Sequence, residues 1–496
     1  MNEVRLRFAP SPTGYLHIGG LRTALYNYLF AKKNGGKLIL RIEDTDQSRF
    51  VEGALENLID AMNWAGIEFD EGVFVKNGEI VQVGDYGPYI QSERLDIYGE
   101  YIDKLIESGH AYYCFCSKER LDSVREGQKA QGLVPKYDGF CRNVSTEDAK
   151  ARIEKGEEYV VRLKLPHDYD IKFHDLVRGD ITINTNDVDD QVLLKSDGYP
   201  TYHMAVVVDD HLMKISHIVR GEEWLPSTPK HVYLYEAFGW EKPVYVHLPT
   251  VLNKERKKLS KREGDVAVGD FKEKGYLPQG LVNYLALVGW SPEDNEEIFP
   301  MDDLIEQFSF ERVSKTGGIF DVDKLDWVNA HYIKDCQLGD LTDKLIPYLI
   351  DAEFIDEKFA EDNREWLELL TETVRDSLHN LSEVVDKVRF VFEDEFEIAS
   401  EEEIAIINEE DAETVLDGIE AELENTDEID MEYAKGLMKK VQKATGVKGK
   451  KLFMPARVGL TGTAHGPEFV NVLVLLGKEK ILKRIRYVKD KYNIGK

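Results

Sequence analysis

Apolar and polar residues at the start of the chain alternate first with the period of a strand and then with that of a helix. Apolar side chains at positions 4, 6 and 8 alternate with charged ones at 3, 5 and 7, which predicts a strand. Leu21, Leu25 and Leu29 then recur at helical spacing until Asn34-Gly35-Gly36 ends the pattern. A second strand pattern follows in KLILRIED (37–44). This order predicts a βαβ unit, in which ligands bind at the carboxyl ends of strands beside a helix N-terminus.

The same patterns divide the whole chain into four regions. Residues 1–86 and 191–248 alternate between strand and helix patterns and predict the two halves of an α/β, doubly wound, Rossmann-like domain. Residues 87–190 mix helices with short strands and predict an α+β insertion into this domain. Residues 249–335 begin with a loop rich in Lys and Arg and continue into helices. Residues 336–496 have apolar residues at spacings of three and four, which predicts an all-α C-terminal half.

Composition indicates a globular protein of several domains. The chain has 496 residues, of which 42% are hydrophobic and 31% charged, and such a length predicts roughly two to four domains. No apolar run is long enough for a membrane span, and the first residues predict a strand and no leader peptide. Four cysteines do not make a disulfide scaffold. We therefore expect a cytoplasmic protein that makes no membrane contact, and we expect a monomer.

The net charge of −30 is unevenly distributed. Residues 351–433 contain about 31 acidic and about 5 basic side chains, whereas residues 434–496 contain about 16 basic and about 3 acidic ones. The basic segment is suited to nucleic-acid phosphates, so the acidic total does not exclude a nucleic-acid partner. A solvated helical face explains the acidic segment, and it remains an equal alternative for the basic one.

Two segments contain residue types that suit the phosphates of a nucleotide. In RFAPSPTGYLHIGGLRTAL (7–25), His17 stands at the head of a helix, where it can donate to a phosphate oxygen, and Gly19 leaves room for the nucleotide. In ERKKLSKREGD (255–265), Lys258 and Lys261 are three residues apart on a loop and can close over the phosphates. Alone, each segment has an ordinary alternative: a structural histidine and a solvated basic loop.

Together, the two segments resemble the paired signatures of class I aminoacyl-tRNA synthetases, His-Ile-Gly-His and Lys-Met-Ser-Lys-Ser. Gly20 replaces the second His, and Leu259 and Arg262 replace Met and Ser. Further motifs in order make the whole chain similar to bacterial glutamyl-tRNA synthetases: RFAPSPTG, RIEDTD, GPYIQSER, SDGYPTYH, VVDDH, RGEEWLPSTP, KLSKR, LTGTAHGP and LLGKEK. The residues matching the two signatures are Pro10, Ser11, Pro12, Thr13, Gly14, His17, Ile18, Gly19 and Gly20, then Lys258, Leu259, Ser260, Lys261 and Arg262.

This resemblance implies an ATP-dependent ligase that uses Mg²⁺ with ATP, forms glutamyl-adenylate and transfers glutamate to the 3′ end of tRNA(Glu). Family members activate glutamate only when tRNA is bound. The resemblance also implies roles for the four regions: catalysis for residues 1–86 and 191–248, acceptor-end binding for 87–190, stem contact for 249–335 and anticodon binding for 336–496. The implied catalytic residues are His17, Lys258 and Lys261. The implied glutamate-binding residues are Arg7, Ala9, Ser11, Glu43, Tyr202, Val206 and Arg220. The implied ATP-binding residues are His17, Gly19, Glu223, Trp224, Leu252 and Lys261.

Physical chemistry supports the amino-acid positions independently. The γ-carboxylate of glutamate suits a bidentate guanidinium, and its ammonium suits a carboxylate. Arg7 and Arg220 lie at the ends of the two predicted strands that flank the expected ligand-binding crevice, and Glu43 supplies the carboxylate for the ammonium. Some relatives have Asn in place of Val206, so we assign this residue no polar role.

The cysteines resemble a zinc knuckle found in some members of the family. Cys114-Phe-Cys116 is followed after 24 residues by Cys141-Arg142-Asn143, where zinc-binding members have His or Cys in place of Asn143. Structural zinc sites need four N or S ligands, and Asn is a poor one. Asp138 is an alternative fourth ligand, and Cys336 lies far along the chain. We expect a metal-free remnant that holds no zinc.

Four other functions remain as alternatives. A small nucleotidyltransferase would leave the C-terminal half unexplained, and a tRNA-binding module without catalysis would not need His17, Lys258, Lys261 and Arg220. The glutamyl-queuosine relative lacks a helical C-terminal half. Glutaminyl-tRNA synthetase is the nearest full-length alternative, but it would have β-barrels after the catalytic half.

The choice of tRNA depends on one predicted helix. LTETVRDSLHNLSEV (370–384) resembles the helix whose arginine reads the third anticodon base in restrictive family members. It contains Arg375, but our alignment places Ser377 opposite that arginine, within one turn. A serine hydroxyl cannot replace the paired donors of an arginine. We hypothesise that the protein also charges tRNA(Gln) with glutamate.

Overall fold

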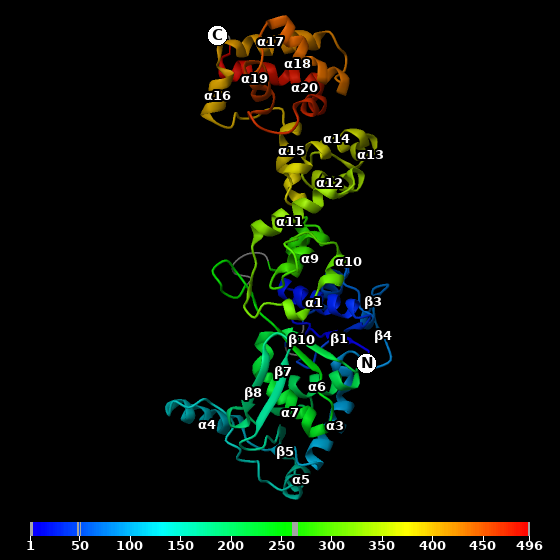
Figure 1. Cartoon of the computed structure of the whole chain (residues 1–496), viewed down its shortest axis with the longest axis vertical. Coiled ribbons are helices and arrows are strands. Elements are labelled where there is room, and N and C mark those ends of the chain that lie inside the picture. The colour runs from blue at the N-terminus through cyan, green and yellow to red at the C-terminus, as the bar shows by residue number, and fades with distance from the viewer. Residues whose placement is uncertain (1–2, 47–48, 50, 260–265, 495–496) are drawn as a thin grey trace. The chain divides into compact units, whose positions relative to one another are not determined.

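The computed structural model describes residues 3–46, 49, 51–259 and 266–494 (Figure 1). These residues form two compact units: Met1–Lys272 with Leu281–Leu325, and Glu273–Gly280 with Asp326–Lys496. The predicted α/β doubly wound fold with an α+β insertion and an all-α C-terminal half is confirmed.

The first unit contains the predicted βαβ opening. Strand β1 (Arg5–Phe8) leads to helix α1 (Ile18–Lys33), and strand β2 (Lys37–Leu40) returns parallel to β1. Helix α1 stops where predicted, since its C-cap is Asn34 and Gly35 follows with a φ of +59°. All four residues of β1 are buried, including the charged ones, because Arg5 donates two hydrogen bonds of 2.9 Å to the Glu71 carboxylate.

Two four-stranded sheets form the centre of this unit. The first has the order β1-β2-β3-β4 and the second β10-β11-β7-β8. The Ser216 N–H, just before β10, donates to the Arg5 carbonyl at 2.9 Å and so joins the two sheets at β1 and β10. The further strands are β3 (Glu71–Lys76), β4 (Glu79–Val83), β7 (Asp170–Asp175), β8 (Gly179–Asn184), β10 (His217–Gly221) and β11 (Val244–Leu248). The helices between them are α2 (Ala54–Trp64), α6 (Tyr202–Leu212) and α7 (Thr228–Phe238).

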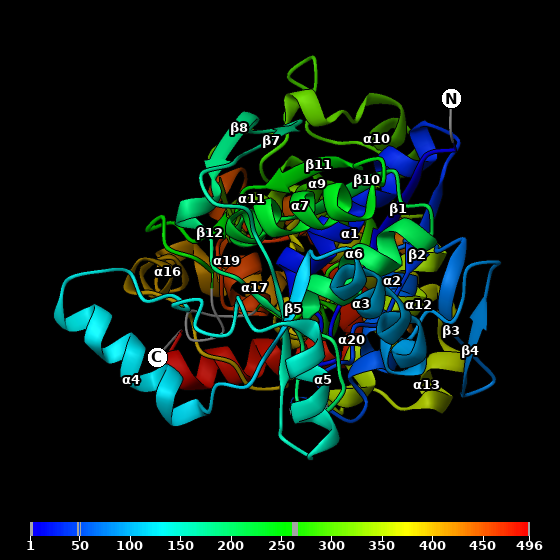
Figure 2. The ribbon, with the colours of Figure 1, turned by 90° about the horizontal axis from the view of Figure 1, so that it is seen from below.

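Part of the stretch predicted as an insertion extends this second sheet, because β7 pairs with β11 at Asp175 and Tyr245. The remainder contributes three helices and the first two strands of a separate antiparallel sheet, β5-β6-β9, whose third strand lies just beyond residue 190. Helix α4 stands away from the sheets in both views (Figures 1 and 2) and buries none of its residues. These elements are α3 (Leu95–Glu107), β5 (Ala111–Cys114), α4 (Lys118–Ala130), α5 (Thr146–Glu154), β6 (Val160–Leu163) and β9 (Val192–Leu194).

The residues after the second sheet are mostly helical and contain one short parallel pair of strands, β12 with β13. The elements are β12 (Val251–Leu252), α8 (Val268–Glu273), α9 (Pro278–Leu287), α10 (Met301–Gln307), β13 (Gly318–Ile319) and α11 (Val322–Asp335). Short 3-10 helices interrupt the first unit at η2 (Gln91–Arg94), η3 (Thr185–Asp187), η4 (Glu222–Ser227) and η6 (Phe310–Arg312).

Within the described part of residues 336–494 the regular elements are all helical, as the spacing of apolar residues predicted. They are α12 (Leu338–Asp351), α13 (Glu357–Asp362), α14 (Arg364–Val374), α15 (Val384–Phe392), α16 (Glu401–Ile407), α17 (Glu410–Glu424), α18 (Met431–Thr445), α19 (Lys450–Thr461) and α20 (Phe469–Tyr492). Buried aliphatic residues such as Leu437, Leu473 and Ile485 join α17–α20 in one core. Across the chain, no helix that the structure describes has the length and apolar character of a membrane span.

The prediction of one helix over 370–384 is wrong. Helix α14 ends at Val374, the 3-10 turns η7 (Arg375–Ser377) and η8 (Leu381–Glu383) follow, and α15 begins at Val384. Leu378, between the turns, has extended backbone angles and is fully buried. Burial of this leucine in the second unit's core outweighs the local helical pattern.

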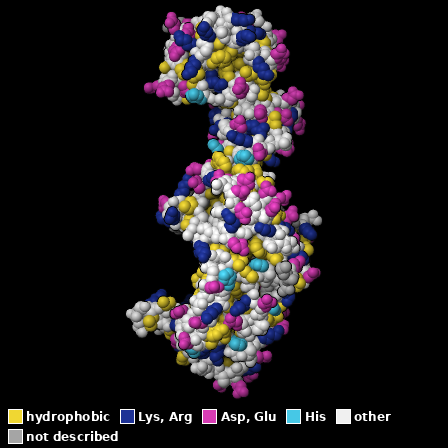
Figure 3. All heavy atoms as spheres, in the orientation of Figure 1, with side chains coloured by type: hydrophobic (Ala, Val, Ile, Leu, Met, Phe, Trp, Pro, Cys, Tyr) yellow, Lys and Arg dark blue, Asp and Glu magenta, His cyan; other side chains and the backbone are white. Residues whose placement is uncertain are grey.

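The charge segments of the C-terminal half are partly paired with each other. Six basic side chains of residues 434–496 form ion pairs with acids of residues 351–433, among them Lys483 with Asp394 at 2.9 Å and Arg486 with Glu420 at 3.2 Å. The other four basic residues are Lys451, Lys480, Lys489 and Lys491. Figure 3 shows acidic and basic side chains intermixed over these helices on the face in view. The basic segment is therefore only partly available for phosphate.

Candidate active site

A cavity of about 590 Å³ opens at the carboxyl ends of β1, β2 and β10. This is the edge at which a doubly wound sheet binds its ligands. Ten of the sequence-predicted residues line it: Arg7, Ala9, Pro10, Ser11, Gly20, Glu43, Tyr202, Arg220, Glu223 and Trp224. Both predicted arginines and the predicted carboxylate therefore reach the same cavity.

Other predicted residues do not line this cavity. Val206 is buried inside α6, Leu252 is the last residue of β12, and Lys258 is exposed on the loop that follows. Ser260, Lys261 and Arg262 lie outside the described residues. Pro12, Thr13, Gly14, His17, Ile18, Gly19 and Leu259 also stand outside the cavity lining.

His17 is the N-cap of α1, the position predicted for it. Its Nδ1 accepts a hydrogen bond of 3.0 Å from the Gly19 N–H, so Nε2 carries the proton of the neutral ring. A Cβ at position 19 would lie 3.3 Å from this Nδ1. The glycine therefore leaves room for the histidine ring itself.

The basic loop is anchored on both sides of its undescribed part. On one side, the Leu259 N–H donates to the Val251 carbonyl at 3.1 Å, which holds Lys258 beside β12. On the other, the Ile18 N–H donates to the Val266 carbonyl at 2.9 Å. Leu259 thus lies beside β12, and Val266, on the far side of the undescribed part, lies beside the head of α1 and next to His17.

Arg7 belongs to a buried cluster of charges below the cavity. Its Nε lies 3.1 Å from Oδ1 of Asp210, and the same oxygen accepts from Arg41 at 2.7 Å. Arg41 also donates to Glu43 at 3.1 Å. Burial works to raise the pKa of Asp210, but Arg41 and Arg7 together lower it below its ordinary value. Burial raises the pKa of Glu43 despite the same two arginines. A bound ammonium group would favour the charged form of Glu43 and so offset the effect of burial on its pKa.

Arg220 is held by a different set of partners, which we name the acceptor shell: Tyr202, Thr228, His231 and His247. Its Nε donates to Nε2 of His247 at 3.1 Å. Its Nη1 donates to the Tyr202 hydroxyl at 3.0 Å and to Nδ1 of His231 at 3.2 Å, and Nη2 donates to the Thr228 hydroxyl at 2.9 Å. The sequence had indicated Tyr202 alone among these partners.

The histidines behind Arg220 predict a loss of stability in acid. His203 Nδ1 lies 3.0 Å from Nε2 of His231, and burial lowers the pKa of His203 to about 3 and that of His231 well below 6.5. Below pH 6.5 the unfolded chain binds protons that the folded histidines reject, so stability falls by up to about 1.4 kcal/mol per pH unit for each histidine. We expect His203→Gln to lose less stability than the wild type between pH 7 and pH 5 in urea unfolding. Equal losses would contradict this assignment.

Glu223 and Trp224 form the rim of the cavity on η4. The Trp224 ring lies 4.3 Å from the Tyr202 ring and remains 37% exposed, so it offers an apolar face to a ligand. A Cβ at Gly221 would lie 2.1 Å from Oε2 of Glu223. A side chain at position 221 would therefore displace the Glu223 carboxylate from the end of β10.

Sequence reasoning missed several cavity residues, although most of them occur in the quoted motifs. Thr45, Asp46 and Gln91 belong to RIEDTD and GPYIQSER, and Pro200 and Thr201 belong to SDGYPTYH. Their occurrence in these motifs is the sequence signal that could have identified them as site residues. Thr23, Arg49, Lys195, Val219 and Gly221 also line the cavity.

Three cysteines lie together in the insertion. The Sγ atoms of Cys114, Cys116 and Cys141 all lie within 4.8 Å of one another. The alternative fourth ligand, Asp138, is engaged with Arg120 at 3.2 Å. The Tyr137 hydroxyl lies 3.4 Å from Sγ of Cys114 and 3.5 Å from Sγ of Cys116. The three thiols thus lie close enough together to bind one zinc ion, but the group beside them in the place of a fourth ligand is the Tyr137 phenol.

The expected absence of zinc stays a prediction. Burial raises the pKa of the Tyr137 hydroxyl, so it remains protonated and is a weak fourth ligand. After dialysis against a mild chelator, elemental analysis should find much less than one zinc per chain. A stoichiometric ion would overturn the prediction.

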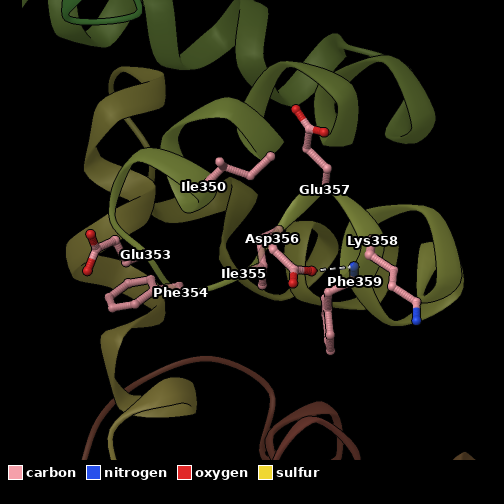
Figure 4. A pocket seen from close by; sticks show the side chains of 8 residues that line it. All are labelled: Ile350, Glu353, Phe354, Ile355, Asp356, Glu357, Lys358 and Phe359. Carbon is pink, nitrogen blue, oxygen red and sulfur yellow. Dashed lines mark hydrogen bonds between the residues drawn. The ribbon is translucent and has the colours of Figure 1, made fainter.

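A second hollow, of about 880 Å³, lies in the helical unit between α12 and α13 (Figure 4). Asp356 in its wall caps α13 by accepting a 2.7 Å hydrogen bond from the Phe359 N–H. Glu353, Glu357 and Lys358 are exposed. The polar groups of this wall thus serve the helix end or face water, and the hollow offers no buried charge for catalysis.

Comparisons with known proteins find similarity to tRNA synthetases over nearly the whole chain. A family model described as the catalytic domain of class I tRNA synthetases (E and Q) matches residues 3–327, and one described as an anticodon-binding domain matches residues 340–489. The chain is 58% identical over 489 residues to a glutamate–tRNA ligase of Clostridioides difficile, covering 98% of this chain and 99% of the relative. It is also 58% identical over 490 residues to one of Alkaliphilus metalliredigens, covering 99% of each.

A solved structure is similar over the same length. The glutamate–tRNA ligase of Elizabethkingia meningosepticum, in complex with its amino acid, superimposes with a TM-score of 0.88 at 36% identity. The similarity covers 99% of this chain and 100% of that one.

Proposed function

The chain belongs to the glutamate–tRNA ligases of the class I tRNA synthetase family, and from that membership we propose that it attaches L-glutamate to the 3′ end of tRNA(Glu). In the first step a carboxylate oxygen of glutamate attacks the α-phosphorus of Mg-ATP, and pyrophosphate leaves. In the second, a hydroxyl of the terminal adenosine attacks the acyl carbon, and AMP leaves. One observation carries the proposal: Arg7, Arg220 and Glu43, from three strand ends, line one cavity.

The two ends of glutamate meet opposite charges in this cavity. Arg220, with the Tyr202 hydroxyl beside it, faces the γ-carboxylate, and Glu43 faces the ammonium. Arg7, Ala9 and Ser11 complete the amino-acid side. The arginine charge is buried, so its interaction with a carboxylate is stronger than it would be in water.

The nucleotide occupies the side of the cavity nearest α1 and the basic loop. His17 donates from Nε2 to a phosphate oxygen, while Gly19 keeps the imidazole in place. Trp224, Glu223 and Leu252 contact the nucleoside. Lys258 and Lys261 approach the phosphates and stabilise charge that develops in the transition state. Magnesium enters with ATP and offsets the phosphate charge.

Glutaminyl-tRNA synthetase is not favoured. The described C-terminal half is helical and contains none of the strands of a β-barrel, and the relatives named above are glutamate–tRNA ligases.

Pyrophosphate exchange tests the proposal. Glutamate, Mg-ATP, labelled pyrophosphate and tRNA(Glu) should give labelled ATP, and omission of tRNA should abolish exchange. Exchange with glutamine but not glutamate would refute the proposal. The enzyme would work as a monomer in the cytoplasm, where ATP and tRNA are present.

The four regions are assigned roles on the same basis. Residues 1–86 and 191–248 catalyse activation, residues 87–190 bind the acceptor end, residues 249–335 contact the stem, and residues 336–496 bind the anticodon. The basic side chains of the last region that form no ion pair with a described residue support its role. Lys439, Lys440 and Lys443 on α18 are exposed and make no ion pair with a described residue.

Removing these lysines should weaken tRNA binding. We expect a Lys439→Ala, Lys440→Ala, Lys443→Ala variant to raise KM for tRNA about tenfold and to flatten its salt dependence, because phosphate contacts are lost. A matched triple replacement of Lys483, Lys489 and Lys491, which are paired with acids, should change KM much less. Equal effects of the two triples would contradict the assignment.

We also propose that tRNA(Gln) is charged with glutamate. Arg375 is the arginine in residues 370–384, the stretch that resembles the anticodon-reading helix. It donates through Nη2 to the Cys336 carbonyl at 2.9 Å and pairs with Glu372 at 3.0 Å. Ser377 is exposed, and its hydroxyl donates to the Val374 carbonyl. Neither side chain offers the paired donors of a restrictive reader. A preference for tRNA(Glu) of about a thousandfold in charging assays would refute this.

A further inference from the structure

Arg220 is a buried cation whose partners are all neutral. A guanidinium has five N–H groups, and the acceptor shell takes four of them. Among the described residues Arg220 forms no ion pair, although its side chain is 94% buried (6% exposed). A buried charge without a counter-ion is costly, so this arrangement calls for an explanation.

The two histidines of the shell must be neutral to accept these bonds. His247 accepts at Nε2, so its proton is on Nδ1, which lies 2.6 Å from Oδ2 of Asp175. His231 accepts at Nδ1, so its Nε2 donates to Nδ1 of His203. Asp175 also accepts from the N–H groups of Val177 and Arg178 through its other oxygen. The carboxylate is thereby fixed and kept one imidazole ring away from Arg220.

Arg7, in the same cavity, has the opposite arrangement. Both its Nε and Nη2 face the Asp210 carboxylate, at 3.1 and 3.4 Å. Its charge is therefore balanced within the protein, whereas that of Arg220 is not. A ligand anion in this cavity gains most from Arg220.

We propose that His247, fixed by Asp175, and His231 are specificity-determining positioning residues that reserve the charge of Arg220 for a substrate carboxylate. This inference rests on the proposed function. Glutamate and glutamine are nearly equal in size and differ in side-chain charge. An arginine already paired with a carboxylate would bind both, whereas an arginine held by neutral acceptors favours the charged one.

The same geometry changes how the carboxylate is bound. The sequence suggested a bidentate guanidinium, but the shell leaves one N–H, on Nη2. The Tyr202 hydroxyl accepts from Arg220, so its own proton is free to be donated. The γ-carboxylate is thus bound by one N–H of Arg220 and the O–H of Tyr202, and the shell stays intact during binding.

The test introduces a carboxylate next to Arg220 by substitution of a residue of the acceptor shell. His247→Glu should raise KM for glutamate about a hundredfold and reduce the preference for glutamate over glutamine at least tenfold, since the guanidinium is then neutralised. KM for ATP should stay within about threefold. His247→Gln, which keeps a neutral acceptor, should retain the preference. The readout is tRNA-dependent pyrophosphate exchange with each amino acid.

Thr228→Asp, with Thr228→Asn as its neutral control, repeats the test at another shell position if the first variant does not fold. Unchanged preference in a folded acidic variant would overturn the inference. Wild-type protein that gives no exchange with glutamate would instead refute the proposed function, so the two failures are distinguishable.

Discussion

Replacing Arg220 with glutamine is expected to lower kcat/KM for glutamate about a thousandfold, because a γ-carboxylate would enter a buried cavity without its cation. Most of the loss should be in KM for glutamate. KM for ATP should change little, since Arg220 lies on the amino-acid side. Tyr202, Thr228 and the shell histidines remain to accept from the glutamine amide, so the fold should survive.

Pyrophosphate exchange measures this effect, with glutamate and ATP varied separately. Lys242→Gln is a suitable control, because it also removes one positive charge from the first unit, outside the cavity lining. A variant of Arg220 with an unchanged KM for glutamate would exclude this residue as the carboxylate partner.

Asp210→Asn is expected to lower the free energy of unfolding by about 3–5 kcal/mol, because it leaves Arg7 and Arg41 buried without their shared counter-ion. Asp210 is fully buried and lies 2.7 Å from Nη1 of Arg41. The same change removes the carboxylate that positions Arg7 in the cavity, so KM for glutamate should also rise.

Urea unfolding of the full chain measures the change in stability. The control is Asp60→Asn, which removes an exposed pair with Lys272 and should cost no more than about 1 kcal/mol. An Asp210→Asn variant as stable as the control would show that the buried cluster is not a main source of stability.

The sequence predicted those parts of the fold that local patterns determine. Alternation around Leu6, helical spacing after Ile18 and the glycines after Asn34 specify the βαβ opening without tertiary information. The break at Leu378 could not be predicted, because it depends on a core formed by distant helices. The surface pairing of Lys483 with Asp394 likewise joins residues 89 positions apart.

The candidate site shows the same limit. Motifs identified Arg7, Glu43 and Arg220, and the fold brings them to one cavity. They did not identify Asp175 or His247, because those residues occur on β7 and β11 in stretches without a motif and meet only through the pairing of these strands. Single-sequence patterns thus locate groups that contact a ligand better than groups that hold them.

Charging of purified tRNA(Glu) with labelled glutamate tests the central claim most directly. With Mg-ATP and full-length protein, we predict acid-precipitable glutamyl-tRNA, formation of one AMP per ester, and no comparable product with glutamine. Folded protein that charges tRNA with glutamine, or that leaves tRNA(Glu) uncharged by glutamate, would contradict the account.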